Sequence, residues 1–161
     1  MTIYLAGGCF WGVQEVFREM KGVTSTSTGY ANSNIDNPKY KQVCQGTTGA
    51  SEAIQINYNP SIVSLQQILD VYFTIIDPTI LNRQGNDRGT QYRTGIYWVT
   101  EDDAKTIEQK INSVQEDYSE AKIVVEVMKL ENYFIAEDYH QNYLKNNPSG
   151  YCHIDIAKHK Q

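Results

Sequence analysis

The chain has 161 residues, a formal net charge of −5 at pH 7, 40% hydrophobic residues and 20% charged residues. This composition is typical of a globular protein rather than a disordered one, and the length fits a single domain, 1–161, that can bury a core. The acidic balance argues against nucleic acid or an anionic membrane as a partner, and no apolar run approaches the roughly 18 residues that span a membrane.

The N-terminal segment and the cysteines indicate the compartment. Residues 1–5 carry no basic cluster and are too short for a signal peptide, so we expect a cytoplasmic protein. The three cysteines, Cys9, Cys44 and Cys152, are too few and odd in number for a disulfide framework. Because cytoplasmic thiols stay reduced, a cysteine in such a chain is more often catalytic than structural.

The first half of the chain predicts three strands and two helices. Apolar residues that alternate with polar ones indicate strands, and apolar residues spaced by three and four indicate helices. The first helix follows Gly7-Gly8 directly, and Ser64 can cap the second. In chain order the predicted elements are a strand at 3–6, a helix at 9–20, strands at 23–30 and 53–58, and a helix at 65–76.

The second half predicts a polar loop at 78–91 and then further strands and helices. Thr100 to Asp103 opens a helix in the manner of a capping box. The remaining elements are strands at 95–99 and 123–130 and a short tyrosine-rich helix at 136–144. From Asn146 onwards, Pro148, Ser149 and Gly150 predict a loop-like, mobile tail.

This mixture of strands and helices predicts the fold class. Strands and helices alternate as βαβ, βα and βαβ, which favours an α+β, two-layer α/β sandwich. The helix between the strands at 53–58 and 95–99 is compatible with a ferredoxin-like, split βαβ core. A long irregular C-terminal segment completes the expected architecture, whose strand order the pattern does not reveal.

Cys9 lies where the first predicted strand turns into the first helix. The free amides and positive dipole end of a helix stabilise a thiolate, so we expect a lowered pKa for Cys9. Gly7 and Gly8 permit a tight turn that leaves the sulfur open. The competing interpretation is that Cys9, Phe10 and Trp11 are core residues. The segment does not spell a dinucleotide-binding fingerprint.

Four separated motifs resemble those of the A-type peptide methionine sulfoxide reductases. The first is Gly8-Cys9-Phe10-Trp11-Gly12. The second comprises Asn37-Pro38-Lys39-Tyr40, Val43-Cys44, Gly46 and Thr48 to Ala53, and the third comprises Arg83 to Asp87 and Gly89 to Arg93. The fourth comprises Tyr139-His140-Gln141, Tyr143-Leu144 and Gly150-Tyr151-Cys152. Their order and spacing over almost the whole chain make the resemblance specific.

The resemblance implies reduction of methionine S-sulfoxide, free or in proteins, by a single catalytic domain without a metal or organic cofactor. Cys9 would attack the sulfoxide sulfur, and Glu52 would donate a proton to its oxygen. A carboxyl beside an apolar pocket can hold that proton because burial disfavours its charged form. The resemblance implies that Tyr40 and Tyr92 hold the oxygen, that Asp87 organises the site, and that Phe10 and Trp11 enclose the methyl group.

The resemblance also implies how the enzyme is regenerated. The attack would leave Cys9 as a sulfenic acid, which Cys152 would convert into a Cys9–Cys152 disulfide. Thioredoxin would then reduce this disulfide. We expect a monomer that repairs oxidative damage. The tail at 157–161 holds no further cysteine, so a relay of two thiols is expected.

The chain departs from the family pattern in two places. Gly49-Ala50-Ser51-Glu52 replaces the usual Gly-His-Ala-Glu, so the familiar histidine beside the acid is absent. The Gly-Tyr-x-Gly-Gly turn is reduced to Gly29-Tyr30-Ala31-Asn32-Ser33, which predicts a different loop before Tyr40. We expect Cys44, with strand-like neighbours, to be structural and His140 to be a packing or capping residue.

Several other functions compete with this interpretation. A cysteine protease or acyltransferase would pair Cys9 with His140 or His153. A thioredoxin-like enzyme would show Cys-x-x-Cys, and a zinc site would show paired ligand spacing, and neither pattern is present. A non-catalytic module that senses redox state through a Cys9–Cys152 disulfide is the alternative from another class. Singly, Glu52 would be a surface carboxylate, Asp87 a turn residue, and Tyr40 and Tyr92 packing residues.

Overall fold

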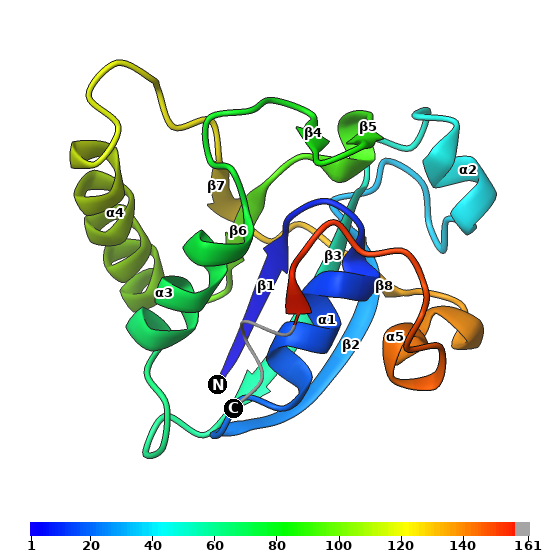
Figure 1. Ribbon diagram of the computed structural model, residues 1–161, viewed down its shortest axis with the longest axis horizontal. Helices are drawn as coiled ribbons and strands as arrows, with labels where there is room; N and C mark the ends of the chain where they lie inside the picture. The colour runs from blue at the N-terminus through cyan, green and yellow to red at the C-terminus, as the bar shows by residue number, and fades with distance from the viewer. Residues whose placement is uncertain (157–161) are drawn as a thin grey trace.

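The computed structural model describes residues 1–156 (Figure 1). The tail at 157–161, for which no third thiol is expected, lies outside the described residues. In chain order the elements are β1 (Thr2–Ala6), α1 (Phe10–Arg18), β2 (Val23–Ala31), α2 (Tyr40–Cys44), β3 (Ser51–Tyr58), α3 (Leu65–Ile75), β4 (Arg83–Gln84), β5 (Asp87–Arg88), η1 (Thr90–Tyr92), β6 (Gly95–Trp98), α4 (Glu101–Glu116), β7 (Glu126–Lys129), β8 (Tyr133–Ile135), η2 (Asp138–His140) and α5 (Tyr143–Asn146).

The main sheet has the strand order β7-β6-β1-β3-β2-β8. The four central strands, β6, β1, β3 and β2, pair antiparallel with one another. Helix α1 joins β1 to β2 across β3, and α3 joins β3 to β6 across β1, so the core consists of two split βαβ units. The predicted α+β, ferredoxin-like fold is therefore confirmed. Strand β7 extends the sheet parallel to β6, and β8 extends the other edge antiparallel to β2.

The two faces of the sheet carry cores of different size. On the helix side, Ile3 and Leu5 of β1 pair with Ile56 and Ile54 of β3, and these side chains pack under the apolar faces of α1 and α3. The alternate residues, such as Tyr4 and Ala6, join a smaller cluster on the other face. Figure 1 shows α1 lying over β3 and β2, and α3 beside α4. The period-2 alternation of the strands thus produces two layers.

Two predicted segments in the middle of the chain differ from the structure. Cys44, expected among strand-like neighbours, ends the short helix α2 and is exposed. The predicted loop at 78–91 contains the β4–β5 hairpin, which the buried side chain of Gln84 ties to the end of α3. Gln84 Oε1 accepts from the Asp77 backbone N–H at 2.8 Å, and its Nε2 donates to the Asp77 carbonyl at 2.9 Å. This polar side-chain anchor leaves no periodic signal.

The predicted helix at 136–144 is wrong. The structure has a 3-10 turn, η2, and a separate short helix, α5, because Asn142 between them adopts a left-handed conformation with φ of 53°. Gln141 exchanges two 2.9 Å hydrogen bonds with the backbone of Thr28 on β2. The Asn142 N–H donates to Gln14 Oε1 at 2.8 Å. These tertiary contacts replace the hydrogen bonds of a continuous helix.

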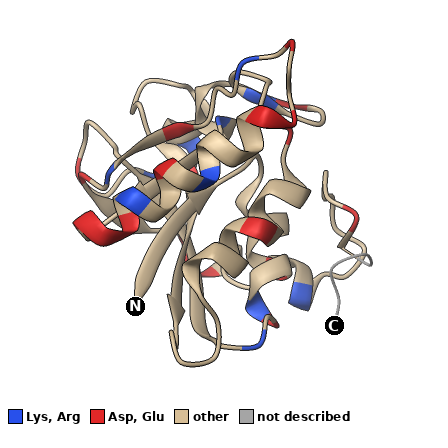
Figure 2. Ribbon diagram, turned by 90° about the vertical axis from the view of Figure 1, so that its left-hand side faces the viewer, with Lys and Arg blue, Asp and Glu red and all other residues tan. Residues whose placement is uncertain are grey.

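The C-terminal segment is irregular, as predicted, but it packs against the rest of the molecule. After α5 the chain returns across α1 (Figure 1), and Ile154 joins the main core at 8% exposure. Acidic and basic residues are interspersed along the outer helices (Figure 2). Among residues 1–156, no helix combines the length and apolarity needed to cross a membrane.

Tyr72 of α3 connects the helical layer to the point where β1 ends. Its hydroxyl is fully buried, donates to the Ala6 carbonyl at 2.7 Å and accepts from the Gly95 N–H at 3.2 Å. Ala6 and Gly95 are partners in the β1–β6 register. Tyr72 therefore fixes the strand end from which the Cys9 turn departs.

Tyr72→Phe should lower the free energy of unfolding by about 1–3 kcal/mol, because it removes a hydrogen bond from a buried carbonyl and from a buried N–H. Urea denaturation would measure the difference. Tyr118→Phe is the control, since this hydroxyl makes no hydrogen bond with residues 1–156, and it should change stability little. Equal stabilities of the two variants would show that the bridge contributes nothing.

Candidate active site

Cys9 is the N-cap residue of α1, with φ of −60° and ψ of 125°. It is 8% exposed and in the thiol form. The turn before it needs glycine for two reasons. Gly8 has a φ of 78°, and a Cβ at Gly7 would lie 2.7 Å from Ile76 Cγ2. The strand, the two glycines and the packing of α3 thus hold the sulfur at the start of the helix.

The pKa of Cys9 differs from the expectation. Burial raises it well above its ordinary value, and the negative charge of Glu52 raises it further, whereas the hydrogen bond from the Trp11 backbone lowers it. The helix terminus does act in the expected direction. Desolvation outweighs it because the turn is covered by other parts of the chain. The expected lowered pKa of Cys9 is therefore not found.

Glu52 lies under the first turn of α1. It alternates with Ser51 and Ala53 along β3, so its side chain shares the helix-facing side of the sheet with Ile54. It is 1% exposed; Oε1 accepts from the Phe10 N–H at 3.2 Å, and Oε2 has no hydrogen-bond partner within residues 1–156. Burial, followed by the nearby charge of Asp87, raises the pKa of Glu52 to about 8 despite the bond from Phe10. The carboxyl is therefore mostly protonated at neutral pH.

Tyr40 and Tyr92 reach the same region from α2 and η1. Both are half-buried. Burial first, and the charge of Glu52 second, raise the pKa of each phenol far above its ordinary value. The pKa of Tyr92 also responds to Asp87 and Cys9. Both phenols are therefore neutral hydrogen-bond donors within electrostatic range of the buried carboxyl.

Asp87 is brought to the site by the β4–β5 hairpin. Its side chain is 17% exposed, and Oδ2 lies 3.7 Å from Nδ1 of His153. Burial raises the pKa of Asp87, while His153 and the Tyr151 hydroxyl oppose this rise. Because Asp87 also contributes to the raised pKa of Glu52, the two acids form one electrostatic group.

Phe10 and Trp11 form an aromatic wall beside Cys9. Trp11 stacks on Tyr143 with centroids 3.8 Å apart, and its Nε1–H donates to Nδ1 of His140 at 2.9 Å. The Phe10 ring, 1% exposed, lies 5.2 Å from the His140 ring. Burial lowers the pKa of His140, which keeps Nδ1 free to accept. The Trp11 ring is therefore held on its face by Tyr143 and at its edge by His140.

Two residues of this wall were not predicted as functional. His140 was expected to pack or cap, and it packs, but it also orients Trp11. Glu137 accepts from the Tyr30 hydroxyl at 2.8 Å and from the Tyr40 N–H at 3.1 Å, which fixes the start of α2. His140 lies within the fourth motif, which is the signal that was available for it; nothing in the sequence pattern marks Glu137.

Cys152 lies against the other side of the first helical turn. Its Sγ occupies the space that a side chain at Gly12 would fill, 2.5 Å from the position of a Cβ there. The Ile154 N–H donates to this Sγ at 3.3 Å. Cys152 also contributes to the raised pKa of Cys9, so the two thiols are close enough to interact.

The structure thus brings together all eight residues predicted for the site, while Cys44 stays exposed on α2, where its thiol faces the Tyr40 hydroxyl. Neither histidine considered as a protease base is hydrogen-bonded to Cys9 within residues 1–156. His140 Nδ1 accepts from Trp11, and His153 Nε2 faces the Gly7 carbonyl at 3.0 Å. In the same residues no cluster of three His, Cys, Asp or Glu side chains could hold a metal.

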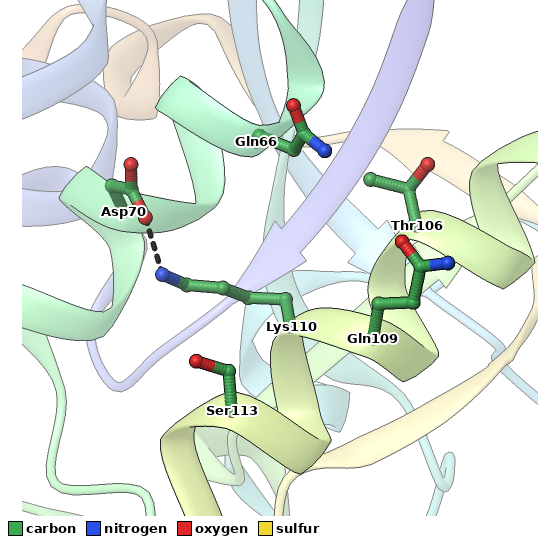
Figure 3. Close-up of a pocket in the computed structure, with 6 residues that line it drawn as sticks. All are labelled: Gln66, Asp70, Thr106, Gln109, Lys110 and Ser113. Atoms are coloured by element: carbon green, nitrogen blue, oxygen red, sulfur yellow. Dashed lines mark hydrogen bonds and ion pairs between the residues drawn. The ribbon is translucent and has the colours of Figure 1, made fainter.

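A hollow of about 220 Å³ lies between α3 and α4 (Figure 3). It contains an ion pair between Lys110 and Asp70 and otherwise neutral polar side chains. It offers no thiol and no buried acid, so it does not compete with the Cys9 region as a reactive site. Its lining residues are Gln66, Asp70, Thr106, Gln109, Lys110 and Ser113.

Comparisons with known proteins agree with this geometry. Residues 1–161 match the family model described as peptide methionine sulfoxide reductase. The chain is 57% identical to the peptide methionine sulfoxide reductase MsrA of Mycoplasma pneumoniae over 94% of this chain and 96% of that protein. The structure of reduced Mxr1 from Saccharomyces cerevisiae superposes with a TM-score of 0.90 at 36% identity, covering 97% of this chain and 90% of the other.

A further solved structure, Mxr1 from Saccharomyces cerevisiae in complex with Trx2, superposes less closely. Its TM-score is 0.63 at 23% identity, with coverage of 89% of this chain and 84% of the other. At this level of identity the similarity concerns the fold.

The raised pKa of Glu52 predicts a pH-dependent stability. Its folded-state pKa of about 8 exceeds the ordinary value of 4.5, so the folded state binds more protons between these values. The contribution of the Glu52 carboxyl to the free energy of unfolding is fully present below about pH 4.5 and is lost as the pH rises to about 8. Relative to the wild type, Glu52→Gln should therefore become more stable across this window by a few kcal/mol, at about 1.4 kcal/mol per unit of pKa.

Urea denaturation at several pH values from about 5 to 9 would measure this difference. Glu108→Gln, at an exposed position of α4, is the matched control and should show a nearly constant difference. A constant difference for Glu52→Gln as well would mean that the Glu52 carboxyl ionises as freely as an exposed one.

Proposed function

The chain belongs to the peptide methionine sulfoxide reductase family, whose members act on methionine sulfoxide, and we propose that it reduces the S epimer, free or in proteins, through Cys9. The observation that carries the proposal is the pairing of a buried thiol at a helix start with a buried, protonated acid beneath the same turn. The Oε2 atom of Glu52 has no hydrogen-bond partner within residues 1–156. A sulfoxide oxygen is the complementary partner for that group.

In this proposal the substrate is held by its methyl group and its oxygen. Phe10 and the immobilised Trp11 provide an apolar wall for the methyl group. The phenols of Tyr40 and Tyr92 and the acid of Glu52 donate to the oxygen, and Asp87 maintains the proton on Glu52 through its charge. Donors that are already in place stabilise the charge that develops on the oxygen as the sulfur is attacked.

The reductase step transfers one oxygen atom. The Cys9 sulfur, as the thiolate, attacks the sulfoxide sulfur and forms an S–S bond while Glu52 protonates the oxygen. This S–S bond and the S–O bond to methionine then break as an S–O bond to Cys9 forms, and the proton lost by the Cys9 thiol restores the Glu52 acid. Methionine is reduced, and Cys9 is oxidised to a sulfenic acid. Protonated Glu52 helps in two ways: it supplies the proton, and it carries no charge that would raise the pKa of Cys9. Protonation of Glu52 thus removes the second cause of the raised pKa of Cys9, while burial, the larger cause, remains.

Cys152 is the proposed resolving thiol. Its Sγ beside Gly12 supports condensation with the Cys9 sulfenic acid, which forms the S–S bond and releases water. Thioredoxin is proposed to reduce the disulfide by thiol–disulfide exchange; the complex of yeast Mxr1 with Trx2 supports this partner by analogy. A single catalytic domain, 1–161, acting as a monomer in the cytoplasm to repair oxidised proteins, completes the proposal.

The decisive assay uses the resolved epimers of a methionine sulfoxide peptide with dithiothreitol. The S epimer should be consumed and the R epimer should not, and Cys9→Ser should abolish consumption. Cys152→Ser should release one methionine per enzyme and then stop when thioredoxin is the reductant. If neither epimer is consumed while a reversible Cys9–Cys152 disulfide forms, the protein is a redox sensor instead. A Cys9–Cys44 disulfide with Cys152 left free would reverse the assignment of the resolving thiol.

Glu52→Gln tests the proton donor. The amide keeps the size and can hydrogen-bond, but it cannot release a proton, so binding should persist while methionine formation slows by about 10²–10⁴-fold. The loss of wild-type rate as the pH rises through about 8 should be absent from the variant. Fast single-turnover kinetics at several pH values would check both points. A wild-type rate with an unchanged pH profile would assign the proton to Tyr40, Tyr92 or water.

A further inference from the structure

We propose that His153 is a positioning residue that anchors the C-terminal segment, so that the Cys152 thiol stays beside the Cys9 turn. This inference rests on the proposed function, because it assigns His153 to the resolution step. The sequence alone suggested His153 only as a possible protease base. The contacts of its ring indicate an anchoring role instead.

The His153 side chain occupies a slot built from two glycines. It is 4% exposed, and its Nε2 lies 3.0 Å from the Gly7 carbonyl. Because a carbonyl oxygen only accepts, Nε2 carries the hydrogen and donates. A Cβ at Gly8 would lie 2.7 Å from His153 Cε1, and a Cβ at Gly85 would lie 2.8 Å from His153 Cβ. The slot is thus shaped by the Cys9 turn on one side and the β4–β5 hairpin on the other.

The neighbouring residue, Cys152, contacts the opposite end of the same turn. His153 binds the backbone two residues before Cys9, whereas the Cys152 sulfur lies against Gly12, three residues after Cys9. Two consecutive residues of the C-terminal segment therefore straddle the nucleophile. If the His153 ring leaves its slot, the position of the resolving sulfur is no longer determined from both sides.

This placement affects one chemical step. Cys9–SOH and Cys152–SH condense to Cys9–S–S–Cys152 and water: the S–O bond of Cys9 breaks, the S–S bond forms, and the thiol hydrogen leaves in the water. The rate of such an intramolecular step depends on how often the two sulfurs are within reach. Attack of Cys9 on the sulfoxide involves no atom of His153, but His153 faces Asp87 and opposes the rise of its pKa. Any substitution of His153 therefore changes the first step through Asp87 to the same extent, whereas loss of the anchoring hydrogen bond slows the second step.

A set of four variants separates the anchor from packing. His153→Leu removes the donor at similar volume. His153→Gln places an amide N–H where Nε2 lies, and His153→Asn carries the same amide on a shorter side chain that does not reach Gly7. Ile156→Val alters packing in the same segment and is the control. In a single turnover with the S epimer, released methionine reports the first step, and thiol titration with mass spectrometry reports disulfide formation.

We expect the three His153 variants to release methionine at rates within about twofold of one another, since each removes the imidazole that faces Asp87 and none changes an atom that attacks the sulfoxide, and Ile156→Val to release it at about the wild-type rate. Disulfide formation should slow about tenfold in His153→Leu and His153→Asn, the effect of one neutral hydrogen bond, and should be restored in His153→Gln. Wild-type disulfide formation in His153→Leu would overturn the inference, as would equal slowing in His153→Gln and His153→Asn. The comparison of His153→Gln with His153→Asn tests the inference even if His153→Leu does not fold. A wild-type protein that releases no methionine would instead refute the proposed function.

Discussion

A carboxyl group buried beneath the start of α1 is the constraint on which the rest of the site depends. Glu52 is on the helix-facing side of β3 because that strand alternates strictly, and the same alternation places Ile54 and Ile56 in the core. Burying an ionised carboxyl without a compensating partner is unfavourable, so the group retains its proton instead. The only hydrogen bond that residues 1–156 give its two oxygens comes from the Phe10 N–H. Burial in the sheet thus keeps the Glu52 carboxyl protonated, and able to act as an acid, at neutral pH.

The nucleophile depends on the same burial. A helix terminus lowers a thiol pKa only as far as desolvation permits, and here α3, the hairpin and the C-terminal segment all cover the turn. Gly7, Gly8 and Gly12 have no side chains where Ile76, His153 and Cys152 approach most closely. Close packing around Cys9 is therefore possible because these three positions are glycines. The site can be compact and still bring several parts of the chain within reach of one sulfur.

Local features of the sequence were sufficient for most of the fold. Periodicity located β1, α1, β2, β3, α3, β6 and α4, and the N-caps Ser64 and Thr100 are found where they were predicted. The failures involve contacts between distant residues. The predicted helix at 136–144 is interrupted by contacts with the Gln14 side chain of α1 and the Thr28 backbone of β2, and the Trp11–His140 hydrogen bond joins residues 129 positions apart. The pKa of Cys9 was misjudged for the same reason, because the groups that bury it come from other parts of the chain.

The immobilised Trp11 ring has a consequence for molecular handedness. A sulfoxide sulfur is a stereocentre that bears an oxygen, a methyl group, the rest of the substrate and a lone pair. Mirror images can be told apart only if separate places exist for these arms, and those places must not rearrange to suit the wrong one. Stacked on Tyr143 and held by His140, the indole cannot turn aside. On the proposed function, an inverted sulfoxide would bring its methyl group against the Glu52 acid and its oxygen against a hydrocarbon wall, so rigidity in one aromatic side chain becomes chiral selection.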